Sequence, residues 1–274
     1  MKQMNQRKKM VVIFVLVVGF LTGVALVGSF CYESARITDF SRKNLKPGIP
    51  YLFGTDWLGR DMLTRTLNGL SMSILIGLCA AIISAIIAFV LGVLAAVGGK
   101  KVDACITWLI DLIMGIPHIL LLILISYGLG KGLKGVIIGV AVTHWTSLAR
   151  VIRAEVLQLK ESQYIKIAER LGHSKWKVAV KHMIPHLLPQ FIVGLILLFP
   201  HAVLHEASIT FLGFGLSPEQ PAIGIILSES MKHLITGKWW LAVFPGVMLV
   251  LTVILFDVAG GTLRKIFDPS SAHE

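Results

Sequence analysis

Long apolar runs separated by short polar connections dominate this chain. A helix needs about 20 residues to cross the roughly 30 Å of a bilayer's hydrocarbon core. Six runs meet or approach that length: Met10–Cys31, Ser71–Val97, Ala104–Gly128, Gly135–Arg150, Leu187–Leu212 and Trp239–Leu263. Pro117 lies inside the third run, where we expect an ordinary helix kink. The pattern predicts an all-α, polytopic membrane protein with six transmembrane helices.

Composition also indicates lipid-facing surface. Of the 274 residues, 55% are hydrophobic and 15% are charged, and the mean hydropathy is +0.79. Soluble domains carry about 25% charged residues, so an ordinary soluble globule is excluded. The net charge of +11 is spread between the apolar runs, without the basic and aromatic alternation typical of base stacking. We therefore expect membrane lipid, and no nucleic acid, as a partner.

The first run begins after Lys2, Arg7, Lys8 and Lys9 and is longer than the apolar core of a secretory signal. We expect a retained membrane anchor. The chain then divides into residues 1–70, an anchor helix with an external segment, and residues 71–274, a five-helix membrane core that includes a long charged loop at about 150–185.

The basic residues between the runs predict the orientation. Cytoplasmic loops carry the excess of Lys and Arg. With the amino terminus inside, 16 of the 26 basic residues are cytoplasmic, and 10 are external. The count favours a multi-pass membrane protein with both termini in the cytoplasm.

Two connections are longer than the others. The outer one, Tyr32–Gly69, contains the run from Gly54 to Asp61, whose glycines and acidic residues suit tight turns and caps. The inner one, Arg150–Pro185, has a helical apolar pattern interrupted by Gly172. It is either a solvated connection folded onto its own membrane domain or a docking element for a cytoplasmic partner.

Four stretches in this order resemble the membrane subunits of bacterial ATP-binding cassette importers, in the branch that carries dipeptides, oligopeptides and nickel. They are Gly54-Thr55-Asp56-Trp57-Leu58-Gly59-Arg60-Asp61, Tyr164-Ile165-Lys166-Ile167-Ala168-Glu169-Arg170-Leu171-Gly172, His182-Met183-Ile184-Pro185 and Phe211-Leu212-Gly213-Phe214-Gly215. The resemblance covers nearly the whole chain. It implies a location in the bacterial inner membrane, with residues 71–274 as the permease core.

The resemblance implies that the inner loop couples this subunit to an ATPase. The residues that match the family's coupling segment are Lys166, Ala168, Glu169, Gly172, Ile184 and Pro185. Lys166-Ile167-Ala168 stands where the family usually has Glu-Ala-Ala. The implied partners are a homologous second permease subunit, two cytoplasmic ATPase subunits and an extracellular solute-binding protein.

The chain itself has no Gly-x-x-x-x-Gly-Lys-Ser/Thr sequence that would cradle a nucleotide phosphate. We therefore expect a transport subunit that is not an enzyme. It would hold no cofactor of its own, and ATP would bind to the partner subunits.

Ionisable residues inside apolar runs are functional candidates, because a charge in lipid is costly. They are Asp111, His118, His144, His201, His205, Glu206 and Asp257. We assign His144, His201, His205 and Glu206 to the substrate path. His201 and His205 are four residues apart on one helix face and predict a transient metal site. The alternative role for these histidines is hydrogen bonding between helices.

The histidines resemble those of nickel importers more than those of peptide importers. The sequence therefore predicts transport of nickel ion or a nickel chelate, with di- or oligopeptide import as the alternative. A passive channel does not need the charged inner loop. An intramembrane zinc protease needs His-Glu-x-x-His, but Ile209 stands where the second histidine of that motif would follow His205 and Glu206.

Overall fold

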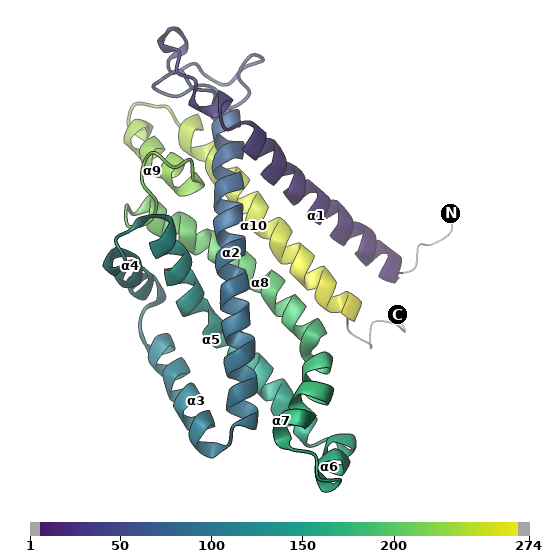
Figure 1. Ribbon diagram of the computed structural model, residues 1–274. Coiled ribbons are helices and arrows are strands. Elements are labelled where there is room, and N and C mark those ends of the chain that lie inside the picture. Colours follow the sequence, from purple (N-terminus) through teal and green to yellow (C-terminus); the bar gives the residue numbers. More distant parts are fainter. Residues whose placement is uncertain (1–5, 268–274) are drawn as a thin grey trace.

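The computed structural model describes residues 6–267, so the chain ends 1–5 and 268–274, and with them Lys2, lie outside the described residues. Within the described part every regular element is helical, apart from an isolated bridge between Thr55 and Asp61. The α-helices in chain order are α1 (Gln6–Phe30), α2 (Met62–Val97), α3 (Lys100–Gly115), α4 (His118–Gly128), α5 (Gly132–Lys160), α6 (Gln163–Arg170), α7 (Lys175–Val178), α8 (Ile184–Phe211), α9 (Ile223–Leu234) and α10 (Trp240–Phe267) (Figure 1).

Five of the predicted spans form helices that are long and apolar enough to cross a membrane. They are α1, α2, α5, α10 and a 37-residue segment, Lys175–Phe211, that contains α8. The third predicted run differs, because α3 and α4 meet at 97°. Counting this bent pair as one span gives six within residues 6–267.

The expectation of an ordinary kink at Pro117 is wrong. Proline disfavours the helical conformation of the preceding residue and has no N–H to donate. Ile116 accordingly has extended backbone angles, φ −95° and ψ 135°, and Pro117 follows at ψ 121°. Helix α4 therefore starts in a new direction at His118.

Helix α2 lies at the centre of the bundle and contacts α1, α5 and α8. Its buried face is built from small residues, including Ala80, Ala85, Ala88 and Gly92. A Cβ atom on Gly92 would lie 2.8 Å from the carbonyl oxygen of Ala149 in α5. In lipid, helices associate through close packing of small residues, so this face fixes α2 against α5.

Helices α1 and α10 run side by side in opposite directions (Figure 1). Val17 and Leu21 of α1 pack with Ala259 of α10 in a small apolar cluster. The opposite face of α1 is open, with Val15 and Leu16 both more than 60% exposed. An apolar exposed face of this kind is typical of a helix that contacts lipid.

The outer segment forms a compact corner above α2. Gly54 and Gly59 have positive φ angles of 71° and 76°, a region that glycine adopts readily. A side chain on Gly59 would collide with the backbone carbonyl of Asp39. Asp61 caps α2 by accepting hydrogen bonds from the N–H groups of Leu63 and Thr64, as its position before the helix predicts.

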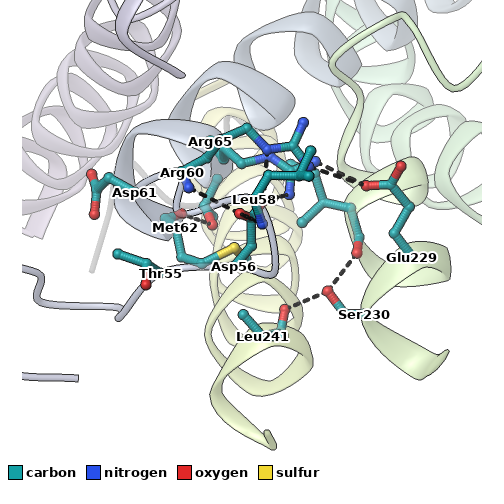
Figure 2. Close-up of polar contacts among 12 residues, drawn as sticks. Thr55, Asp56, Leu58, Arg60, Asp61, Met62, Arg65, Glu229, Ser230 and Leu241 are labelled. Atoms are coloured by element: carbon teal, nitrogen blue, oxygen red, sulfur yellow. Dashed lines mark hydrogen bonds and ion pairs between the residues drawn. The ribbon is translucent and has the colours of Figure 1, made fainter. Parts of the chain in front are cut away.

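A buried carboxylate holds this corner together (Figure 2). Asp56 is fully buried and accepts hydrogen bonds from the N–H groups of Leu58 at 2.8 Å and Arg60 at 2.9 Å. Arg65 of α2 donates to Asp56 at 2.6 Å and to Glu229 of α9 at 2.9 Å. The ion pairs thus tie the outer segment to two helices.

The inner connection is mostly helical. Helix α5 continues to Lys160, beyond the predicted end of the fourth run at Arg150. Helices α6 and α7 follow, joined at Gly172 with a φ of +85°, and a π-helical turn, Ala179–Met183, leads into α8. Figure 1 places α6 and α7 at the end of the bundle opposite to α9 and the outer segment.

Candidate transport pathway and docking surface

Three histidines from three helices meet inside the bundle. His118 is the first residue of α4, His144 lies in α5, and His205 lies in α8. The ring centroid of His118 is 4.5 Å from that of His144 and 4.5 Å from that of His205, and the last two are 5.0 Å apart. One ring nitrogen from each lies within 4.8 Å of the other two. We call this group the histidine cluster.

The local sequence explains how each ring is held. The break before α4 brings His118 to the bundle interior. His144 is 8% exposed, and its Nδ1 atom lies 2.9 Å from the carbonyl oxygen of Val140, one turn earlier in α5. The hydroxyl of Thr143 is 3.1 Å from the same nitrogen. These contacts fix the orientation of the His144 ring.

The cluster lines a cavity of about 580 Å³. Met114, Pro117 and Ser147 contribute to its wall between the α3–α4 break, α5 and α8. A volume of this size is within the range of small-molecule sites, about 300–1,000 Å³. His201, one turn before His205, is exposed and lines both this cavity and a second one of about 330 Å³.

The structure therefore brings three of the four predicted path residues to one cavity: His144, His201 and His205. Glu206 is fully buried elsewhere, where its Oε1 atom accepts a hydrogen bond from Thr210 at 3.0 Å. The sequence paired His201 with His205 as metal ligands. In the structure the three histidines whose ring nitrogens lie close together are His118, His144 and His205, and His201 is not among them. The sequence identified His118 as ionisable but gave no sign of its contacts.

Two ion pairs join α3 to α5. Arg153 donates to both carboxylate oxygens of Asp103, at 2.5 Å and 2.6 Å. Arg150 donates to Asp111 at 2.5 Å, which gives this intramembrane carboxylate a partner. The pairs hold the first half of the broken span against the bundle.

The α6–α7 end of the bundle exposes apolar and basic side chains together. Its exposed apolar side chains are Tyr164, Ile167, Leu171, Trp176 and Val180. Basic residues accompany them: Arg170, Lys175, Lys177 and Lys181. We call these nine residues the α6–α7 surface. Apolar patches with a polar rim are typical of protein contacts.

The predicted coupling residues have different positions around this surface. Ala168 is buried beneath it, whereas Lys166, Glu169 and Gly172 are exposed. Lys166 is engaged with Glu161, with 2.7 Å between Nζ and Oε2. Ile184 and Pro185 begin α8, directly after the π-helical turn.

Comparison of the sequence with known protein families identifies one that matches most of the chain. Residues 88–273 match the family described as "Binding-protein-dependent transport system inner membrane component". The chain belongs to this family of permeases. Membership makes it a membrane subunit of an ATP-binding cassette importer, so the ATPase is a separate chain and a solute-binding protein delivers the solute.

Curated relatives extend the match over nearly the full permease. The dipeptide transport system permease protein DppC of Bacillus subtilis is 30% identical over 265 residues, which cover 96% of this chain and 83% of the relative. The oligopeptide transport system permease protein OppC of the same organism is 33% identical, covering 84% and 77%. A putative peptide transport system permease of Brucella suis is 35% identical, covering 81% and 75%.

A solved structure has the same fold. A chain of the MetNI methionine transporter, in an inward-facing conformation, aligns with a TM-score of 0.61 and 19% identity. The alignment covers 76% of this permease and 98% of that chain. The fold is therefore the importer permease fold, as the sequence predicted. The nickel prediction has no support from the three relatives, which are named for peptides.

Proposed function

We propose that this permease forms half of the membrane pathway of an importer for dipeptides or oligopeptides. The observation that carries this proposal is its similarity to dipeptide and oligopeptide permeases along most of both chains. The cavity between α3, α4, α5 and α8 offers room for part of such a solute. A homologous second permease subunit would complete the pathway.

The α6–α7 surface is the proposed contact for two cytoplasmic ATPase subunits, one on each permease. Its exposed aromatic and aliphatic side chains fit recognition of helices in a groove. Gly172 separates two short helices: α6 contacts α5, and α7 leads through the π-helical turn into α8. Movement at the contact would therefore reach the helices that line the cavity. ATP would bind to the partners, and this chain would hold no cofactor.

This assignment gives the orientation of the bundle. The α6–α7 end and both termini would be cytoplasmic, in agreement with the positions of the basic residues. The outer segment and α9 would lie outside the inner membrane, where the solute-binding protein docks.

Cysteine crosslinking tests the docking proposal in the assembled transporter. The background variant has Cys31, Cys79 and Cys105 replaced by alanine. Leu171→Cys on the α6–α7 surface should form crosslinks to the ATPase, because Leu171 is 74% exposed. Ile235→Cys is the matched control, since Ile235 is 96% exposed at the α9 end. Crosslinking of the ATPase at 235 and not at 171 would invert the proposed orientation.

A second candidate solute is nickel ion or a nickel chelate. The observation that favours it is the convergence of three imidazoles on one cavity, since imidazole is a good ligand for nickel. Uptake by cells that express the complete transporter and lack other importers separates the two solutes. A labelled dipeptide should enter and free nickel should not. Nickel uptake without peptide uptake would replace the first candidate with the second.

A further inference from the structure

The histidine cluster has ring nitrogens without a protein partner. The Nε2 atoms of His118 and His144 are buried, and neither atom makes a hydrogen bond to any described residue. Leaving a buried polar atom unpaired is unfavourable, because the atom loses its hydrogen bonds to water and gains none in the protein. Hydrogen bonding between helices would satisfy these nitrogens, and the observed geometry does not provide it. The cluster is therefore suited to a ligand that contacts the nitrogens of all three rings.

The contact of His144 with Val140 fixes which nitrogen is available. A carbonyl oxygen only accepts, so the 2.9 Å contact requires a proton on Nδ1 of His144. In the neutral ring, Nε2 then carries a free lone pair. Histidine ligands of metals commonly donate their other N–H to a backbone carbonyl in this way, which fixes the tautomer and the ring orientation.

The three rings lie close together without stacking. His118 and His205 each make a T-shaped contact with the His144 ring, at interplanar angles of 79° and 69°, and the planes of His118 and His205 are tilted by 56°. In a tetrahedral site with metal–nitrogen distances of about 2.1 Å, ligand nitrogens are about 3.4 Å apart. The observed distance between the ring nitrogens is at most 4.8 Å, so each ring would need to shift by less than about 1 Å to reach this ligand spacing.

We infer that His118, His144 and His205 bind a divalent transition-metal ion at the cavity wall, in the class of Ni²⁺, Co²⁺ and Zn²⁺. Three neutral imidazoles leave at least one coordination position open to the cavity, where water or a donor atom of the solute can bind. The site joins α4, α5 and α8, so an ion there bridges the helix that follows the 97° break to the rest of the bundle.

This inference goes beyond the proposed function, because it concerns ion binding by the chain's own side chains and holds for either solute. A peptide-type solute that carries a metal ion would use the cavity and the open position together. In a transport pathway the ion must also be released, so we expect binding in the micromolar range or weaker.

Metal binding by the purified, assembled transporter tests the site directly. The complex carries an affinity tag without histidine and is dialysed against Ni²⁺ or Co²⁺. The wild type should bind one ion per copy of this permease with visible Co²⁺ absorption typical of tetrahedral nitrogen coordination. His144→Ala should weaken binding at least 10-fold. His173→Ala is the matched control, because His173 is exposed at the α6–α7 end, and it should leave binding unchanged.

The conservative variants His118→Gln and His205→Gln keep the experiment informative if His144→Ala fails to assemble. Loss of the Co²⁺ spectrum in either, with intact assembly and ATPase activity, supports the site. Equal binding by the wild type and all three cluster variants overturns the inference, as does no binding up to about 1 mM metal. Dipeptide uptake is measured on the same preparations. Uptake without metal binding defeats only this inference, and metal binding without dipeptide uptake defeats only the proposed solute.

Discussion

Arg65 donates to Glu229 across 2.9 Å and so joins residues that are 164 positions apart in the chain. The same guanidinium donates to Asp56 at 2.6 Å, inside the outer segment. Arg60 reaches Asp56 as well, at 2.7 Å. One buried carboxylate and one buried arginine thus hold the outer segment, α2 and α9 in a fixed arrangement on the side proposed to receive the solute-binding protein.

Replacing Arg65 with methionine should destabilise the protein by about 3 kcal/mol, because it leaves the fully buried Asp56 with one cationic partner. The measurement is equilibrium unfolding of the purified protein in mild detergent. Arg42→Met is the control, since Arg42 and its partner Asp39 are both well exposed, and it should cost less than about 1 kcal/mol. Equal losses in the two variants would show that burial of the pair is unimportant.

The packing of α2 against α5 gives a second prediction. Gly92→Ala should destabilise the bundle by about 1–3 kcal/mol, because the new methyl group meets the backbone of Ala149 at 2.8 Å. Gly23→Ala in α1 has open space around it and should be neutral or slightly stabilising, since alanine favours the helix. Thermal unfolding of both variants in detergent makes the comparison. A Gly92→Ala protein as stable as Gly23→Ala would contradict close packing here.

Hydropathy predicted the helical spans because each spanning helix contains a long apolar run. It could not predict the break at Ile116, which arises from the backbone chemistry of Pro117 inside an equally apolar run. The helical pattern after Arg150 was predicted, but its continuity with the fourth span was not, since α5 continues to Lys160 after its sequence becomes charged. Hydrophobicity therefore predicts which segments lie in lipid. It does not predict where a helix breaks or ends, because that depends on backbone conformation.

The histidine cluster was only partly predictable. The spacing of His201 and His205 places them on one face, but it does not determine which other helices that face meets. Glu206 follows His205 directly and therefore points about 100° away around α8, toward Thr210. His118 joins the cluster only because the break before α4 turns it inward. These relationships come from tertiary packing.

Acidification should destabilise the outer end of the bundle through His233. Its ring stacks on Trp57 with centroids 4.4 Å apart, and burial there, with Lys238 nearby, lowers the pKa of His233. A histidine whose folded pKa is below the unfolded value of about 6.5 binds more protons in the unfolded state, so stability falls as the pH drops through that region. Melting temperatures should decrease more between about pH 7.5 and pH 5.5 in the wild type than in His233→Gln. If melting temperature depends on pH equally in the two proteins, His233 does not contribute to the acid sensitivity.

The last prediction concerns the joint between α6 and α7. Gly172 has a φ of +85°, and a Cβ atom added there would meet nothing within 4 Å, so within this subunit a substitution acts through backbone strain. Gly172→Val should cost about 1–2 kcal/mol locally and shift the α6–α7 surface. The transporter should still insert and assemble, while ATP hydrolysis becomes uncoupled from uptake.

Gly172→Asn is the matched control, because asparagine tolerates the left-handed region and should retain coupling. The measurement is solute imported per ATP hydrolysed in reconstituted vesicles. Normal coupling in Gly172→Val would show that this joint transmits no movement, and equal uncoupling in Gly172→Asn would assign the effect to side-chain bulk at the contact instead of backbone angle.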